Sequence, residues 1–207
     1  GIAELQFFDL IGAQVLARSG DFAKAASFLD ERLKQDPSTI WADILRHSRE
    51  LHMANATAWQ EELALRAKEP ANLPRVLLKT TAGEIELVLF EDDAPQTVAN
   101  FLHLAELKTA ESKGYYEGVK FHRLATHFVV QGGCPKGTGA GSPGWSIKNE
   151  AKRQHWRGSI AMARSGHPDS AGSQFYFILE DSQAARSLDS GRYTVFGRVV
   201  RGLDVMD

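Results

Sequence analysis

Apolar residues recur at helical spacing through the first third of the chain. They fall every three or four positions, as on one face of an amphipathic helix. The stretches 18–22 and 54–57 interrupt the pattern, and prolines follow two of its parts at 37 and 70. The pattern predicts four helical segments that pack as helical hairpins, around residues 5–15, 22–33, 41–45 and 59–63.

A faint internal repeat runs through the same region. Similar residues stand 34 positions apart, the period of tetratricopeptide repeats, and the pairs are Phe7 and Trp41, Leu10 and Ile44, Leu29 and Leu63, and Lys34 and Lys68. Residues 20–37 resemble the second half of such a repeat. Two interpretations stay open for residues 1–72, a tetratricopeptide-like helical module and a plain four-helix segment that packs on its neighbour.

The pattern changes after Pro74. Residues 75–90 alternate as two short strands around Ala82 and Gly83, and residues 94–108 read as a helix with Pro95 in its first turn. Five later apolar runs are short and bounded by glycine-rich loops. Residues 73–207 are therefore predicted as a closed antiparallel β-barrel with flanking helices, and the whole chain as α+β.

Composition narrows the classes of function. The 207 residues are 43% hydrophobic and carry a net charge of −2, so no basic excess favours nucleic acid or an anionic membrane. No apolar run reaches the roughly 20 residues of a membrane span. The seven histidines show no metal-ligand spacing, and the single Cys134 excludes an internal disulfide. We expect a soluble protein without metal or cofactor, cytoplasmic or periplasmic, whose N-terminus is trimmed before Gly1.

Six ordered blocks between residues 75 and 207 resemble cyclophilin-type peptidyl-prolyl isomerases, particularly bacterial ones. Six blocks in order are far more specific than an isolated QGG. They are APQTVANF (94–101), YYEGVKFHR (115–123), FVVQGGCPKGTGAG (128–141), GSIAMAR (158–164), AGSQFYFIL (171–179) and LDSGRYTVFGRV (188–199).

The resemblance implies a chemistry that suits these residues. Rotation about an X-Pro bond crosses a barrier of about 20 kcal/mol, and the twisted amide leaves lone-pair density on the prolyl nitrogen. A fixed donor aimed at that nitrogen stabilises the twisted state, with no proton loss or covalent bond. The resemblance gives this role to Arg123, oriented by Gln131.

The resemblance also implies the substrate-binding positions. An apolar pocket would hold the proline ring, a short segment would receive the peptide backbone, and a loop glycine would lie beside the residue before proline. The positions are Phe128, Val129, Tyr176, Leu188 and Tyr193 for the pocket, Ala163, Arg164, Ser165 and Gln174 for the backbone, and Gly137 for the loop.

Several positions depart from the common family pattern. Val129 replaces methionine, and Tyr176 replaces phenylalanine and needs a partner for its hydroxyl. Ser187 stands where eukaryotic members often have tryptophan, which implies weak cyclosporin binding. Tyr193 replaces histidine, and Arg164 stands where asparagine is common, which implies an altered peptide preference.

Three functional hypotheses follow. The first is an enzyme that isomerises X-Pro bonds in protein substrates and assists folding. The second is a module that binds proline-containing segments with little turnover, while the helices mediate protein interaction. In the third the helices only cap the barrel. A family strand that pairs with the first strand would follow residues 202–207, outside this sequence, and residues 1–70 are candidates to cover residues 75–80.

Overall fold

The computed structural model describes residues 2–37, 41–108 and 114–207. The chain divides into two compact units, Gly1–Glu69 and Pro70–Asp207. The first is helical and the second contains a β-sheet. Among the described residues no helix combines the length and the apolar character needed to cross a bilayer.

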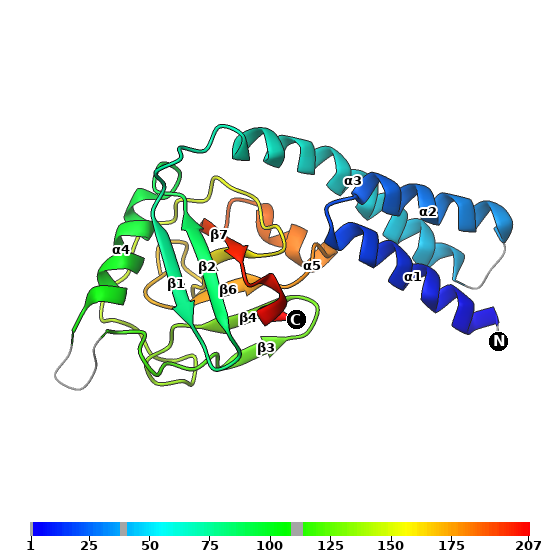
Figure 1. The fold of residues 1–207 in the computed structure, drawn as a ribbon. Helices are drawn as coiled ribbons and strands as arrows, with labels where there is room; N and C mark the ends of the chain where they lie inside the picture. The colour runs from blue at the N-terminus through cyan, green and yellow to red at the C-terminus, as the bar shows by residue number, and fades with distance from the viewer. Residues whose placement is uncertain (1, 38–40, 109–113) are drawn as a thin grey trace. The chain divides into compact units, whose positions relative to one another are not determined.

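In its described part, the helical unit consists of α1 (Ile2–Arg18), α2 (Phe22–Gln35) and α3 (Ala42–Arg66). Consecutive helices run antiparallel (Figure 1), and α2 packs against both others. Their apolar faces meet in a small core that includes Phe22, Ala25, Leu29 and Leu45. The hairpin packing predicted from the helical spacing is therefore present.

The turn between α1 and α2 depends on Gly20. Its φ of +83° lies in the left-handed region, and a Cβ at this position would approach the indole nitrogen of Trp59 to 2.9 Å. A glycine avoids both the backbone strain and the clash. The predicted break at residues 18–22 is confirmed.

The predicted break at residues 54–57 is wrong, because α3 continues through it. This stretch contains neither glycine nor proline, its two alanines favour helix, and Asn55 is buried with 1% exposure. Packing of this face outweighs the turn tendency of asparagine and threonine. A single helix thus replaces the two expected segments, and the tetratricopeptide-like organisation stays a prediction.

The second unit contains a seven-stranded antiparallel sheet in its described residues. The strand order is β1-β2-β7-β5-β6-β4-β3. The strands are β1 (Arg75–Lys79), β2 (Glu84–Leu89), β3 (Arg123–Ala125), β4 (Val129–Gly132), β5 (Ser159–Met162), β6 (Phe175–Ile178) and β7 (Val195–Arg201). The first hairpin and the five later strands lie where the sequence predicted them.

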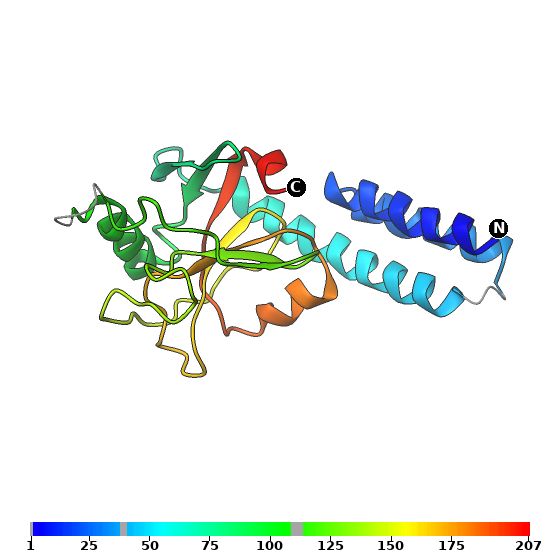
Figure 2. The same cartoon turned by 90° about the horizontal axis from the view of Figure 1, so that it is seen from below.

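Helix α4 (Pro95–Glu106) confirms the predicted helix, with Pro95 in its first turn, and lies beside the strands in both views (Figures 1 and 2). The shorter helices are α5 (Gln183–Arg186), η1 (Ser187–Asp189) and η2 (Leu203–Met206). Strands β1 and β3 end the strand order, and no pairing among the described residues joins them. The predicted closure of the barrel is therefore not confirmed.

The two faces of the sheet support two apolar clusters. Along β6, Phe175 and Phe177 belong to one cluster, together with Phe101 of α4, whereas Tyr176 and Ile178 belong to the other. This alternation follows from the pleat of a strand, which directs successive side chains to opposite faces. The second cluster, which contains Tyr176, is where the candidate site lies.

Candidate functional site

Strand register places three of the predicted site residues in one row. Arg123 of β3 is opposite Gln131 of β4, and Gln131 is opposite Tyr176 of β6. Directly opposed residues of antiparallel strands project to the same face of the sheet. The row therefore brings a guanidinium, an amide and an aromatic ring together, although they are distant in sequence.

Hydrogen bonds fix the polar part of this row. Arg123 Nη1 donates to Gln131 Oε1 at 3.2 Å, and Gln131 Nε2 donates to Gln174 Oε1 at 3.0 Å. Gln174 Nε2 donates in turn to the carbonyl oxygens of Gly139 at 2.8 Å and Gly141 at 2.9 Å. The chain of bonds orients both glutamine amides and tethers the glycine loop.

The apolar residues predicted for the pocket share the second cluster. Val129 and Tyr176 are buried, with 2% and 5% exposure, and are packed among other core side chains. The partly buried residues Phe128, Leu188 and Tyr193 pack against them. The arrangement gives an aromatic and aliphatic surface with a buried base, next to the row that carries Arg123.

The hydroxyl of Tyr176 has a buried partner that the sequence did not reveal. His155 Nε2 lies 2.9 Å from Tyr176 Oη, and the two rings stack with centroids 6.0 Å apart. On its other side, His155 Nδ1 lies 2.8 Å from Asp189 Oδ1, which also accepts the His155 backbone N–H at 2.7 Å. The sequence predicted that the Tyr176 hydroxyl needs a hydrogen-bond partner, but it did not identify His155 as that partner.

Burial raises the pKa of the Tyr176 phenol, and the neighbouring Tyr193 and Asp189 raise it further, against a smaller lowering by Arg164. The phenol therefore stays protonated at neutral pH. It can donate its hydrogen to His155 and takes no part in proton transfer as an anion.

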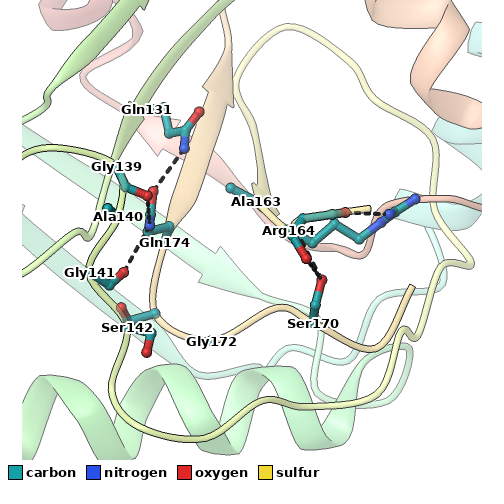
Figure 3. A pocket seen from close by; sticks show the side chains of 12 residues that line it. Gln131, Gly139, Ala140, Gly141, Ser142, Ala163, Arg164, Ser170, Gly172 and Gln174 are labelled. Atoms are coloured by element: carbon teal, nitrogen blue, oxygen red, sulfur yellow. Dashed lines mark hydrogen bonds between the residues drawn. The ribbon is translucent and has the colours of Figure 1, made fainter. Parts of the chain in front are cut away.

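A cavity of about 310 Å³ opens beside the row. Figure 3 shows Gln131, Gln174 and residues 139–142 on one side, with Ala163, Arg164 and Ser170 across from them. Of the predicted site residues, the cavity gathers the catalytic candidate Gln131 and the substrate-binding candidates Gln174, Ala163, Arg164 and Ser165. The lining residues that sequence reasoning missed are Gly139, Ala140, Gly141, Ser142, Ser170, Gly172 and Ser173.

Gly137 does not line this cavity. Its φ is +62°, with open space around it, and its N–H donates to the carbonyl of Cys134 at 2.9 Å. Cys134 is the buried anchor of the same loop, and its Sγ accepts the N–H of Gly141 at 3.2 Å. Burial raises the pKa of this thiol, but the backbone N–H groups of residues 141, 138, 136 and 139 outweigh it and bring the pKa to about 7.

The described side chains that line the cavity do not include a cluster of metal ligands. Across residues 2–37, 41–108 and 114–207, no three histidine, cysteine or acidic side chains gather as a metal site would require. The site consists of the Arg123 guanidinium, the hydrogen-bonded amides of Gln131 and Gln174, an apolar surface and a polar cavity. Such a set can hold an extended peptide and present a cation to it without forming a covalent bond.

Comparison with known proteins agrees with this arrangement. Residues 75–207 match the family described as cyclophilin type peptidyl-prolyl cis-trans isomerase/CLD. A peptidyl-prolyl cis-trans isomerase of Helicobacter pylori is 44% identical, over 69% of this chain and 84% of that protein. Peptidyl-prolyl cis-trans isomerase B of Bacillus subtilis is 43% identical, over 59% of this chain and 80% of that protein.

Solved structures show the same relationship. A cyclophilin type isomerase of Cryptosporidium parvum superposes with a TM-score of 0.58 and 30% identity, over 65% of this chain and 82% of its own. A second structure of that protein, in the presence of the dipeptide Ala-Pro, gives a TM-score of 0.57. From its sheet, its site and these relatives, the chain belongs to the cyclophilin-type peptidyl-prolyl cis-trans isomerase family.

Proposed function

We propose that this isomerase accelerates rotation about X-Pro bonds of protein chains with Arg123 as the residue that stabilises the twisted amide. The observation that carries the proposal is the chain of hydrogen bonds from Arg123 through Gln131 to Gln174, next to the apolar cluster of Tyr176. A guanidinium is always charged and presents its donors in a rigid fork. Donors fixed before the reaction cost no reorganisation in the transition state.

The proposed mechanism is non-covalent. The proline ring rests on the surface of Phe128, Val129 and Tyr176, while the preceding residue and its carbonyl turn. When amide conjugation is lost, an N–H group of Arg123 donates to the prolyl nitrogen. Gln131 holds the guanidinium and can bind the substrate backbone, since its bonds to Arg123 and Gln174 leave one N–H of Nε2 and one lone pair of Oε1 unused. No proton leaves the enzyme.

The remaining predicted residues have supporting roles in this proposal. Ala163, Arg164 and Ser165 receive the peptide backbone along the cavity, and Gln174 keeps the opposite wall in place. Leu188 and Tyr193 close the far side of the proline surface. Gly137 is proposed for the loop next to the residue before proline, where its open surroundings leave space for a bound chain.

Cis/trans exchange of a short X-Pro peptide, measured by NMR, tests the proposal. We expect the chain to accelerate exchange and Arg123→Ala to reduce kcat/KM about 100-fold, the usual cost of one transition-state donor. Arg46→Ala, which removes an exposed arginine of α3, is the matched control. Unchanged catalysis in Arg123→Ala would overturn the role of this residue. Peptide binding without accelerated exchange would instead favour the binding-module hypothesis.

For residues 1–72 we propose a helical module that engages a protein partner or client. The support is the apolar stripe of Phe8, Ile11 and Val15 on α1, whose side chains are 63%, 42% and 62% exposed and lie at helical spacing. Replacing Phe8 and Val15 by serine should slow catalysed refolding of a proline-limited protein without changing catalysis on a short peptide. Equal loss on both substrates would contradict this role.

A further inference from the structure

Arg164 is the one charged residue among those that line the cavity. Arg123, next to the same cavity through Gln131, is also cationic. Among the described residues, neither guanidinium has a carboxylate within ion-pair distance, unlike Arg186, which pairs with Asp181 and Asp189. The site therefore carries uncompensated positive charge, although the whole chain has a net charge of −2.

The guanidinium of Arg164 is held in a fixed position. Its Nε donates to the carbonyl of Arg192 at 2.6 Å, and Nη1 donates to the carbonyls of Ser165 at 2.8 Å and Gly166 at 3.3 Å. It also lies 4.5 Å from the ring centroid of Tyr193. These contacts hold the charge before any ligand arrives, which lowers the entropy lost on binding.

The contacts leave one edge of the guanidinium available. They use Nε and Nη1, whereas Nη2 has no hydrogen-bond partner among the described residues. Its neighbours at the cavity are neutral, and the hydroxyls of Ser165 and Ser170 bond to each other at 2.8 Å. A charged donor with two unused N–H bonds suits an anionic oxygen, because charge-assisted hydrogen bonds are the stronger ones.

The position of this charge connects it to the proposed proline surface. Tyr193, on which Arg164 stacks, packs edge-on against Tyr176 with ring centroids 6.2 Å apart. The guanidinium thus lies one aromatic ring away from the base of that surface. Successive residues of an extended chain are separated by roughly 3.3–3.6 Å. A substrate side chain within two positions of the proline can reach it.

We infer that the isomerase prefers X-Pro segments that carry a carboxylate side chain within two residues of the proline, and that Arg164 determines this preference. The inference rests on the proposed function and names the substrate class of the same site. Attraction between the fixed cation and the substrate carboxylate lowers the free energy of the bound peptide. The positive charge of Arg164 also repels a lysine at that position. Selectivity therefore comes both from attraction of acidic segments and from repulsion of basic ones.

The test uses the full chain and matched X-Pro peptides with glutamate or glutamine at each of the two positions on either side of the proline. These side chains are nearly isosteric, so the ratio of kcat/KM values reports charge. We expect a glutamate-to-glutamine ratio of about two to five for at least one position, as for a partly exposed ion pair. High salt should bring the ratio toward one, since the Debye length falls to about 3 Å at 1 M.

Two variants assign the effect to Arg164. In Arg164→Gln the ratio should fall to about one, whatever happens to the overall rate. Lys79→Gln removes the same charge from the exposed end of β1, which three other strands separate from β6 in the sheet order, and should keep the wild-type ratio. A wild-type ratio that persists in Arg164→Gln would overturn the assignment.

The outcomes separate this inference from the proposed function. If glutamine peptides are isomerised and every glutamate-to-glutamine ratio equals one, the inference fails and the isomerase mechanism stands. If no peptide is isomerised faster than in buffer, the proposed function and the inference both fail. Preferential catalysis on glutamate peptides that disappears with Arg164→Gln and with salt supports the inference.

Discussion

The phenol oxygen of Tyr176 lies 2.9 Å from Nε2 of His155, deep under the proposed proline surface. Asp189 accepts from Nδ1 of the same ring, so a neutral imidazole carries its hydrogen on Nδ1 and presents the Nε2 lone pair to the tyrosine hydroxyl. The three residues connect β6 to the short helix η1 that precedes the loop of Tyr193. The ring of Tyr176, at the base of the proposed proline surface, is thereby linked through His155 to Asp189 of η1.

Tyr176→Phe should destabilise the second unit by about 1–3 kcal/mol, because it leaves the buried Nε2 of His155 without a donor. Urea unfolding, followed by tyrosine and tryptophan fluorescence, gives the change in the free energy of unfolding. Tyr193→Phe is the matched control. The hydroxyl of Tyr193 has no hydrogen bond within the described residues, and its loss should cost less than about 0.5 kcal/mol. Equal costs for the two variants would show that the bond to His155 contributes nothing.

Gln131 and Gln174 should act as one unit in catalysis. Each single replacement by alanine breaks the same bond of 3.0 Å and releases Arg123 or the glycine loop. We expect each variant to lose about tenfold in kcat/KM, and the double variant to lose less than the product of the two losses. The coupling should correspond to about 0.5–1.4 kcal/mol, because residues in one hydrogen-bond network couple and a tenfold loss in each single variant limits the shared part to about 1.4 kcal/mol.

A double-mutant cycle on X-Pro exchange measures this coupling. Thermal unfolding of the four proteins serves as the control, because a change in catalysis with an unchanged melting temperature separates positioning from stability. Strictly additive losses would mean that Gln174 does not act through Gln131.

His52 should make the stability of the helical unit depend on pH. Burial lowers the pKa of this imidazole below 6.5, and its Nδ1 has no hydrogen-bond partner in the part of the chain that the structure describes. The unfolded chain therefore binds a proton more readily than the folded unit. The free energy of unfolding should fall as the pH drops below 6.5, and stop falling below the folded pKa.

Unfolding of the full chain at several pH values, followed by helical circular dichroism, measures this slope. His52→Leu keeps an apolar contact to Phe22, on which the ring stacks, and should remove most of the slope. His47→Gln replaces an exposed histidine of the same helix and should retain it. The same slope in His52→Leu and the wild type would contradict the prediction.

Local pattern predicted the elements of this fold well. Period-two alternation located the first hairpin, and short apolar runs between glycine-rich loops located the five later strands. The placement of Phe175 and Tyr176 on opposite faces follows from the pleat of a strand. The continuation of α3 through residues 54–57 was not predictable in this way, because burial of Asn55 is a tertiary effect. Closure of the sheet also depends on pairing between distant edges, which local sequence does not specify.

The site likewise contains residues that the sequence predicts and residues that only the folded structure reveals. Side chains with a distinctive chemistry, such as Arg123 and Gln131, could be selected from the sequence by resemblance. The carbonyls of Gly139 and Gly141 carry no side-chain signal, yet they hold Gln174 in place. His155 lies in a segment without periodicity, 21 residues before Tyr176, and only the folded chain brings the two together.

The row of Arg123, Gln131 and Tyr176 has a consequence for how the enzyme matures. Its members come from three strands, and the bond between Gln131 and Gln174 joins residues 43 positions apart. A slip of one residue in β4 would turn Gln131 to the opposite face. If this row catalyses the reaction as proposed, activity requires that β3, β4 and β6 have paired in register. We therefore expect a newly synthesised chain to be inactive until then, and the recovery of activity during refolding to report the pairing of these three strands.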